Sequence, residues 1–244
     1  MKIFLTGDDG VNSVGFNLLL KLLSKNHDVF AIVTKAQQSG VGGYMTLKSK
    51  LTFTRQKIGN ADVVIVDGSP SDGINAVRAF TKEKFDLIIS GVNSGENISS
   101  AIISSGTFSA AVRAIGNDIA DKAIVFSMKT NWKKYFIDHE STPDIEHLID
   151  YPGKKILELI DLMIKEDFYG SKVVNINLPD KPTSEIKITK IDKDWSNYYY
   201  NDLYIEGDKV IFKFDKFYTE NENYDVNYDT GALNSGFISI TPID

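Results

Sequence analysis

The sequence predicts an α/β fold of the Rossmann-like, three-layer α/β/α type, with a mainly parallel sheet and a C-terminal β-hairpin arm. Short apolar runs alternate with helical patterns from Met1 to about Pro179, and the first strand–helix–strand unit fits within about thirty residues. Farther on, apolar and polar residues alternate on both sides of a Glu206-Gly207-Asp208 turn, as in a hairpin. We therefore expect an α/β body over 1–182, and a segment over 183–244 that carries the arm and a final strand returning to the body.

The strands of the body are expected to be continuous apolar runs, because parallel strands are buried on both faces. Such runs occupy Lys2–Thr6, Val29–Val33, Ala61–Val66, Phe85–Ser90, Ala123–Met128 and Lys172–Asn177. Helical patterns lie between them, at Phe16–Leu23, Phe108–Ile115, Asp144–Asp150 and Gly153–Lys165, and Ser13 is a possible cap of the first. One more helix has Ile74, Val77 and Phe80 on its apolar face, with Ser71 as a possible cap.

The predicted hairpin region runs from about Ile186 to Phe214. Ile186, Ile188 and Ile191 alternate with polar residues at its start, the aromatic cluster Trp195–Tyr200 follows, and the turn joins Leu203–Ile205 to Val210–Phe214. A last strand is expected at Gly236–Pro242. A two-stranded hairpin is marginally stable alone in water and usually needs a partner surface. That surface can belong to a second subunit, or the hairpin can pack on its own domain, and the residues leave both open.

Composition excludes several classes of function. The chain has 244 residues, a net charge of −6 and no basic stripe, so nucleic acid polymers are not expected partners. It has no cysteine, which excludes disulfides, thiolate catalysis and cysteine-ligated zinc. We see neither a signal peptide nor an apolar run long enough to cross a membrane, and expect a cytoplasmic protein that does not bind membranes.

Two adjacent carboxylates, Asp8 and Asp9, follow the first strand and are flanked by Gly7 and Gly10. Ligands bind at the carboxyl ends of strands in open α/β sheets. Adjacent acids repel each other and need a cation or a shared proton, and a hard divalent metal suits their oxygens. An ordinary Asp-Asp-Gly turn is the alternative.

Three further polar segments follow strands or open helices. Ser39 lies in a Gly-rich loop that could reach the Asp pair or could be a plain surface loop. Asn93 and Asn97 follow the fourth apolar run, and their side-chain carbonyls are suitable neutral metal ligands. Ser105-Gly106-Thr107 opens a helix, where free N–H groups can bind an anion, although simple capping explains the same residues.

Taken together, these segments resemble the SurE family of survival-protein nucleotidases. The matching stretches are Asp8-Asp9-Gly10-Val11, Ser39-Gly40 with Thr46, Ser90–Asn97, and Ser105-Gly106-Thr107 with Ala110-Ala111. The resemblance implies a SurE-like fold with an arm exchanged between subunits in a homodimer or a tetramer. It also implies one Mg²⁺ or Mn²⁺ per subunit on Asp8, Asp9, Ser39 and Asn93, and a phosphate pocket lined by Asn97, Ser105, Gly106 and Thr107.

The implied activity is divalent-metal-dependent hydrolysis of nucleoside 5′-monophosphates, and of 3′-monophosphates as a further substrate. Asp8 and Asp9 would hold the cation, and either could orient or deprotonate the attacking water. The chain departs from the family pattern at Gly7, where Asn is usual, and at Ser104, where Tyr is usual. A non-catalytic metal- or nucleotide-binding relative is therefore the alternative. A dinucleotide-dependent oxidoreductase is disfavoured, because the first turn lacks Gly-x-Gly-x-x-Gly.

Overall fold

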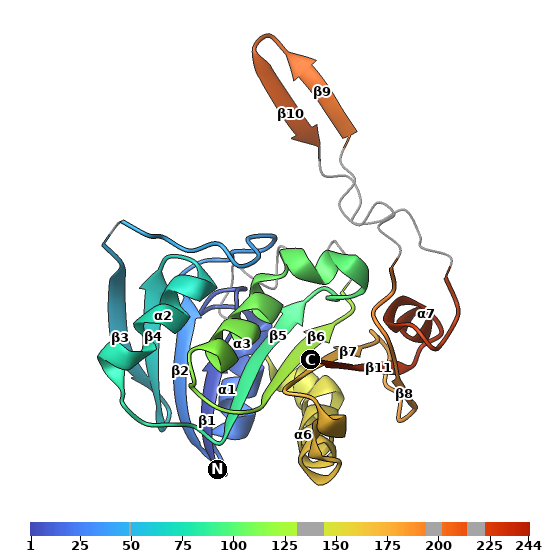
Figure 1. Cartoon of the computed structure of the whole chain (residues 1–244), viewed down its shortest axis with the longest axis horizontal. Coiled ribbons are helices and arrows are strands. Elements are labelled where there is room, and N and C mark those ends of the chain that lie inside the picture. Colours follow the sequence, from blue (N-terminus) through green and yellow to red (C-terminus); the bar gives the residue numbers. More distant parts are fainter. Residues whose placement is uncertain (49, 131–143, 194–201, 214–222) are drawn as a thin grey trace.

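A computed structural model of the chain describes residues 1–48, 50–130, 144–193, 202–213 and 223–244. Its centre is a nine-stranded sheet in the order β3-β4-β2-β1-β5-β6-β7-β11-β8 (Figure 1). The strands are β1 (Lys2–Thr6), β2 (Asp28–Thr34), β3 (Thr52–Ile58), β4 (Ala61–Asp67), β5 (Leu87–Ser94), β6 (Ala123–Met128), β7 (Val173–Leu178), β8 (Ile186–Ile188) and β11 (Ile238–Ile243).

The sheet is mainly parallel, as predicted. Strands β4, β2, β1, β5, β6 and β7 pair in parallel, whereas β3 pairs antiparallel with β4 and β11 pairs antiparallel with β7. From β1 the chain moves outward through β2 to β4, then returns to β5 on the other side of β1 and continues to β7. The strand order therefore reverses between β1 and β5, and ligands of open α/β sheets bind at the carboxyl ends of strands at such a switch point.

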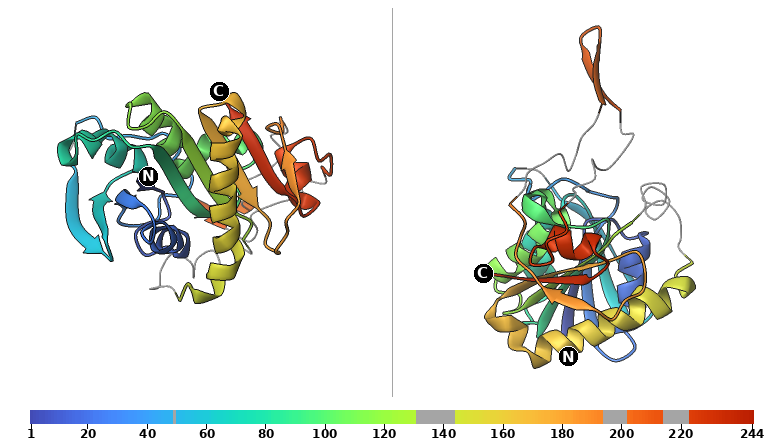
Figure 2. Two further views of the ribbon diagram at one scale, coloured as in Figure 1. Left: turned by 90° about the horizontal axis from the view of Figure 1, so that it is seen from below. Right: turned by 90° about the vertical axis from the view of Figure 1, so that its right-hand side faces the viewer.

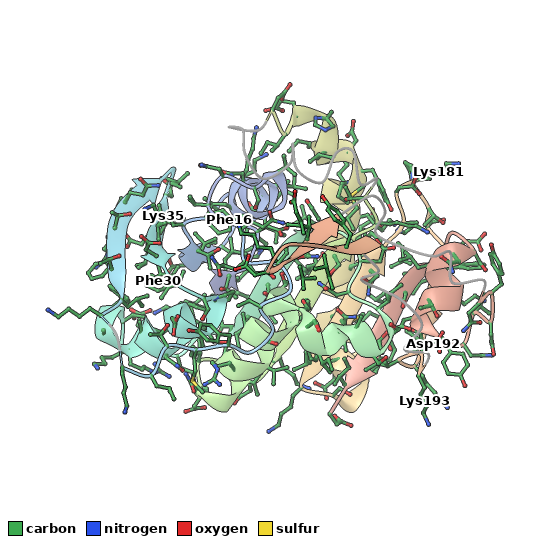
Figure 3. All side chains as sticks on the ribbon, turned by 90° about the horizontal axis from the view of Figure 1, so that it is seen from above. Phe16, Phe30, Lys35, Lys181, Asp192 and Lys193 are labelled. Carbon is green, nitrogen blue, oxygen red and sulfur yellow. The ribbon has the colours of Figure 1, made fainter. Side chains whose placement is uncertain are left out.

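Helices cover both faces of the sheet and confirm the three-layer prediction. Helices α1 (Val14–Leu23) and α6 (Lys154–Lys165) pack on one face, and α2 (Pro70–Phe80) and α3 (Gly106–Gly116) on the other. Each face has its own apolar cluster. Phe16 packs with the first cluster, whereas Phe30 packs with the second, on opposite sides of the sheet (Figure 3).

Helix α1 begins as predicted, because the Ser13 side chain accepts a hydrogen bond from the Phe16 N–H. Helix α2 begins differently: Ser69, not Ser71, is its cap, and Ser69 and Asp72 form a reciprocal capping box. The prediction of Ser71 was wrong because Pro70, whose fixed φ suits a first helical position, starts the helix two residues earlier.

Other segments differ from expectation in length or type. The stretch Asp144–Asp150, predicted to be helical, contains only the short turns η2 (Glu146–Leu148) and η3 (Ile149–Gly153) before α6. Strand β3 and helix α7 (Asp229–Asn234) were not predicted. The remaining short helices are η1 (Ser99–Ser104) and η4 (Asp167–Gly170). Within the described ranges, no helix is long and apolar enough to span a membrane.

The predicted hairpin is present as β9 (Asp202–Glu206) and β10 (Lys209–Lys213), which pair antiparallel with Ile205 opposite Val210. Its predicted start near Ile186 was wrong, because Ile186–Ile188 form β8, which pairs with β11 in the main sheet. The hairpin stands clear of the body in Figure 1 and in the right-hand view of Figure 2. The aromatic cluster Trp195–Tyr200 and Phe214 lie outside the described residues.

Candidate functional site

Asp8 and Asp9 lie just beyond β1, at the point where the strand order reverses. Both are buried, with 2% and 4% of their surface exposed. Two buried carboxylates side by side are costly unless positive charge or hydrogen bonds compensate them. The contacts around each acid therefore indicate what the site can hold.

Helix α3 approaches Asp8 directly. The Thr107 hydroxyl donates a short hydrogen bond to Asp8 Oδ1. A Cβ on Gly106 would lie 2.6 Å from Asp8 Oδ2, so any side chain at that position would collide with the carboxylate. The glycine thus lets the N-terminus of α3, with its partial positive charge, begin against the acid.

Burial, and then the charge of Asp9, raise the pKa of Asp8 to about 7, against the lowering effect of hydrogen bonds from Thr107. The chain's own hydrogen bonds thus only partly compensate the buried charge. A bound divalent cation would favour the ionised form of Asp8 through direct attraction.

The last two residues of β5, Asn93 and Ser94, connect this strand to both acids. The Ser94 N–H donates to Asp9 Oδ2 at 2.7 Å. The side-chain Nδ2 of Asn93 donates to Gly95 O at 2.7 Å. The side-chain Oδ1 of Asn93 lies 3.1 Å from Thr107 Oγ1. Since Thr107 Oγ1 also bonds Asp8, the oxygens of Asp8 and Asn93 converge on one hydroxyl.

Ser39 reaches the same region on the loop after β2. The Gln38 N–H donates to the Asp8 carbonyl at 2.7 Å, which places this loop beside the Asp pair. Ser39 itself is exposed, and its hydroxyl accepts a hydrogen bond from Gln37 Nε2 at 2.8 Å. The structure therefore places Ser39 at the rim, with Asp8, Asp9 and Asn93 deeper inside.

These donors fit a hard divalent cation. They are two carboxylates, one amide carbonyl and a nearby hydroxyl, all oxygen ligands of the kind that Mg²⁺, Mn²⁺ or Ca²⁺ accepts. The part of the chain that the structure describes contains no group of three His, Cys, Asp or Glu side chains arranged for a metal. A cation here would rely on Asn93, Ser39, water or substrate oxygens to complete its coordination.

The four residues expected in the phosphate pocket occupy different settings. Gly106 and Thr107 contact Asp8. The Ser105 hydroxyl caps α3 by accepting from the Phe108 N–H at 3.0 Å. Asn97 is buried, and its side-chain amide donates to Ser127 Oγ at 2.9 Å. Their roles toward phosphate remain predictions.

Asn175 and Asn177 of β7, which were not predicted to be site residues, hold the loop around Asn97 in place. Asn177 Oδ1 accepts from the Asn97 N–H at 2.8 Å, and the amides of Asn175 and Asn177 both donate to the Asn97 carbonyl. The available signal was two Asn residues two apart in an otherwise apolar strand, because side chains at i and i+2 lie on one face. Buried amides in β7 need partners, and the site loop supplies them.

A profile of the family described as Survival protein SurE matches residues 3–201. The chain belongs to the SurE family. It is 28% identical to 5′/3′-nucleotidase SurE of Salmonella paratyphi A over 254 residues, covering all of this chain and 90% of that protein. It is also 28% identical to 5′-nucleotidase SurE of Clostridium beijerinckii over 250 residues, covering all of this chain and 92% of that protein.

The fold agrees with a solved member of the SurE family. The crystal structure of the SurE protein from Aquifex aeolicus matches with a TM-score of 0.72 and 24% identity, covering all of this chain and 93% of that one. The sequence-based fold prediction, including the C-terminal hairpin, is therefore confirmed. The departure from the SurE pattern at position 7 is not imposed by packing, because a Cβ on Gly7 would make ordinary contacts of 3.5 Å.

Proposed function

We propose that this chain is a divalent-metal-dependent phosphomonoesterase that hydrolyses nucleoside 5′-monophosphates, and 3′-monophosphates as a further substrate, to nucleoside and phosphate. The names of its relatives support the substrate class. The observation that carries the proposal is the convergence of Asp8, Asn93 and Thr107 at the switch point, with the N-terminus of α3 against Asp8. That arrangement combines oxygen ligands for a cation with a helix terminus suited to an anion.

Different residues would bind the metal ion and the phosphoryl group. Asp8, Asp9 and Asn93, with Ser39 at the rim, would hold one Mg²⁺ or Mn²⁺. When bound, such a cation polarises phosphoryl oxygens and lowers the pKa of water. The backbone around Gly106 and Thr107 would attract the phosphoryl charge through the dipole of α3. Whichever carboxylate oxygen remains uncoordinated can accept the proton of the attacking water.

We also propose a homodimer in which the hairpin packs on a second subunit. Ile205 and Val210, cross-strand partners on one face of the ribbon, are 78% and 55% exposed in the single chain. Among the described residues this ribbon pairs with no further strand, and its exposed apolar residues are better accounted for by a partner surface than by water. An exchanged element of this kind is a common route to two-fold dimers.

The experiment is phosphate release from a panel of nucleoside 5′- and 3′-monophosphates with Mg²⁺, with Mn²⁺, or with a chelator. We expect turnover that requires the metal and is lost on chelation. Metal binding without turnover on any member of the panel would instead establish the non-catalytic alternative, which the missing polar group at Gly7 motivates.

A further inference from the structure

Asp72, at the third position of α2, is a buried carboxylate outside the site described above, and only 6% of its surface is exposed. Its Oδ2 accepts a hydrogen bond from the Ser69 N–H at 3.0 Å, which completes the capping box of the helix. Its Oδ1 accepts from the Thr46 N–H at 2.7 Å, and its Oδ2 also accepts from the Thr46 hydroxyl at 3.1 Å. Helix capping does not require the two bonds from Thr46.

The charge of Asp72 strengthens these bonds. Although burial acts to raise its pKa, hydrogen bonds from the backbone N–H groups of Thr46 and Ser69 hold that pKa below its usual value. The carboxylate is therefore ionised at neutral pH, and hydrogen bonds to an ionised acceptor are stronger than those between neutral groups. Thr46 is thus tied to the start of α2 by two charge-assisted bonds.

Thr46 ends a loop, residues 38–46, that begins beside the Asp pair of the candidate site. At its start, the Gln38 N–H donates to the Asp8 carbonyl at 2.7 Å. Near its end, the Ser69 hydroxyl donates to the Tyr44 carbonyl at 2.7 Å, next to the bonds between Thr46 and Asp72. One end of the loop is therefore fixed by the site and the other by the first turn of α2.

Between these ends the loop lies against the start of α3. The Gly42 N–H donates to the Ser104 carbonyl at 2.9 Å. A Cβ on Gly106 would lie 3.0 Å from Val41 Cγ1, so Val41 packs against the same glycine that contacts Asp8. Because Ser39 lies between Gln38 and Val41, the position of this candidate metal ligand depends on how the loop is seated.

The loop has little local structure of its own to fix its shape. Three of the five residues from 39 to 43 are glycines, which have more conformational freedom than any other residue. Its internal backbone hydrogen bonds are two turns of 3.2 Å, from Val41 to Gln38 and from Tyr44 to Val41. Contacts with other segments, of which the bonds to Asp72 involve a full charge, must therefore hold it.

We propose that Asp72 is a positioning residue for the candidate site. Its carboxylate holds the loop over the start of α3, and the seated loop keeps Ser39 and Val41 beside Asp8. In this role Asp72 acts only through the loop and takes no part in the reaction. The expected effect on turnover rests on the proposed phosphomonoesterase activity, whereas the effect on the loop is measurable without it.

The test variant is Asp72→Ala, which removes both carboxylate oxygens. The matched control is Ala79→Gly at an exposed position of α2, which destabilises the same helix but leaves the bonds to the loop in place. A second variant, Thr46→Val, removes only the hydroxyl donor and leaves the capping box intact. Each protein is measured by backbone hydrogen exchange, by Mn²⁺ binding, and by KM and kcat for AMP.

We expect the amides of residues 39–46 to exchange at least about tenfold faster in Asp72→Ala, with a smaller increase in Thr46→Val, because the loop opens locally once its anchor is lost. The Kd for Mn²⁺ should rise about tenfold, as for other residues that orient metal ligands. KM for AMP should rise, with kcat little changed at saturating Mn²⁺. Ala79→Gly should increase exchange only within α2.

Unchanged exchange of residues 39–46 in Asp72→Ala, or an equal increase in Ala79→Gly, would overturn the proposal. So would a full additional effect of Thr46→Val in the Asp72→Ala background, because directly bonded partners should not be additive. If Asp72→Ala does not fold, unchanged exchange in Thr46→Val overturns the proposal by itself. If the unmodified protein hydrolyses no nucleoside monophosphate, the proposed function fails, and hydrogen exchange and Mn²⁺ binding still decide the role of Asp72.

Discussion

The candidate site and the hairpin both contain side chains in energetically unfavourable surroundings, but they differ in what surrounds them. At the switch point, Asp8 and Asp9 are buried, and residues from three separate segments of the same chain contact them. In the hairpin, Ile205 and Val210 face each other across two strands and are largely exposed. The site is assembled within one subunit, whereas the hairpin contacts no other strand of the described chain.

Under the proposed dimer, this difference separates catalysis from assembly. The ligand candidates keep their geometry because β1, β5 and α3 are packed in the core of one subunit. The hairpin gains stability only from a surface outside itself. Variants at the site should therefore change chemistry without changing oligomeric state, and variants on the hairpin should do the reverse.

The largest effect is expected from Asp8→Asn, with Asp9→Asn behaving similarly. Each removes one negative charge from the ligand set, and even residues behind metal ligands typically cost 10–100-fold when changed. Loss of a ligand should therefore reduce metal-dependent kcat/KM by more than about 100-fold. The matched control is Asp67→Asn, which removes an exposed acid paired with Lys35 at the end of β4.

Circular dichroism should show an intact fold in both site variants, because no packing is lost. Near-normal turnover in both would mean that the carboxylates do not hold the catalytic cation. Light scattering should give the same mass for all three variants, as the comparison between the two regions requires.

The second prediction concerns the hairpin. Replacing Ile205 and Val210 together with lysine places two positive charges on one face of the ribbon, at cross-strand partners. If that face is buried in a dimer, the charges lose hydration without gaining a partner, and the protein becomes monomeric at micromolar concentration. Light scattering after gel filtration measures the mass.

The control is Tyr204→Lys, one residue along β9 and on the opposite face of the ribbon. It should leave the mass unchanged. A dimeric double variant would show that the interface lies elsewhere. Deletion of 187–213 would be a poorer test of the interface, because it also removes Lys187 and Ile188 of β8, which pair with β11 in the main sheet.

The sequence predicts the central sheet well because its strands are buried on both faces and therefore read as continuous apolar runs. Strand β3 carries no such signal: it is an antiparallel edge strand, and its seven residues are exposed except Ile58 at its end. Helix α7 has six residues, four of which are Asp, Thr, Gly and Asn, types common in turns. Both β3 and α7 depend on contacts with distant segments, and the local pattern of apolar residues does not predict such contacts.

The candidate site shows the same limit. The proximity of Asp8, Asp9 and Asn93 could be predicted, because the carboxyl ends of parallel strands such as β1 and β5 lie at the same edge of the sheet. Their role as metal ligands stays a prediction. The hydrogen bond between Thr107 and Asp8 joins residues 99 positions apart, and that between Asn97 and Asn177 joins residues 80 positions apart. Such contacts depend on the register between elements, which a single sequence does not specify.

The third prediction tests the hydrogen bond between Asn97 and Asn177. Asn177→Ala removes the acceptor of the Asn97 N–H inside the protein, and an unpaired buried N–H costs about 1–3 kcal/mol of unfolding free energy. We expect that loss in chemical denaturation, with a smaller loss of activity than in Asp8→Asn. Asn175→Ala is the matched control, because it removes only a donor to the Asn97 carbonyl, which Asn177 also serves.

The smallest effect comes from the root of the hairpin, where the two regions meet. Asp229, at the start of α7, accepts hydrogen bonds from the backbone of Ser99, Asp192 and Thr230, and so ties both sides of the root to the body. Figure 3 shows Asp192 beside this helix. Burial raises the pKa of Asp229 to about 6, although these three N–H groups act in the opposite direction.

A raised folded-state pKa means that Asp229 stabilises the fold at low pH, and that this contribution is lost as pH rises through about 6. Between pH 5 and pH 8 the loss amounts to about 1 kcal/mol. Asp229→Asn cannot titrate, so its unfolding free energy should fall by about 1 kcal/mol less than that of the unmodified protein over this interval. Asp8, which also has a raised pKa, contributes equally to both proteins and cancels in the difference.

The measurement is urea denaturation at both pH values in the presence of a chelator, with Asp225→Asn as a control at an exposed acid four residues before the buried one. Equal pH dependence in Asp229→Asn and the unmodified protein would show that the root opens to water. The root would then resemble the exposed hairpin rather than the site. The predicted difference would show that Asp229 stays buried against Ser99, Asp192 and Thr230 in solution, as it is in the structure.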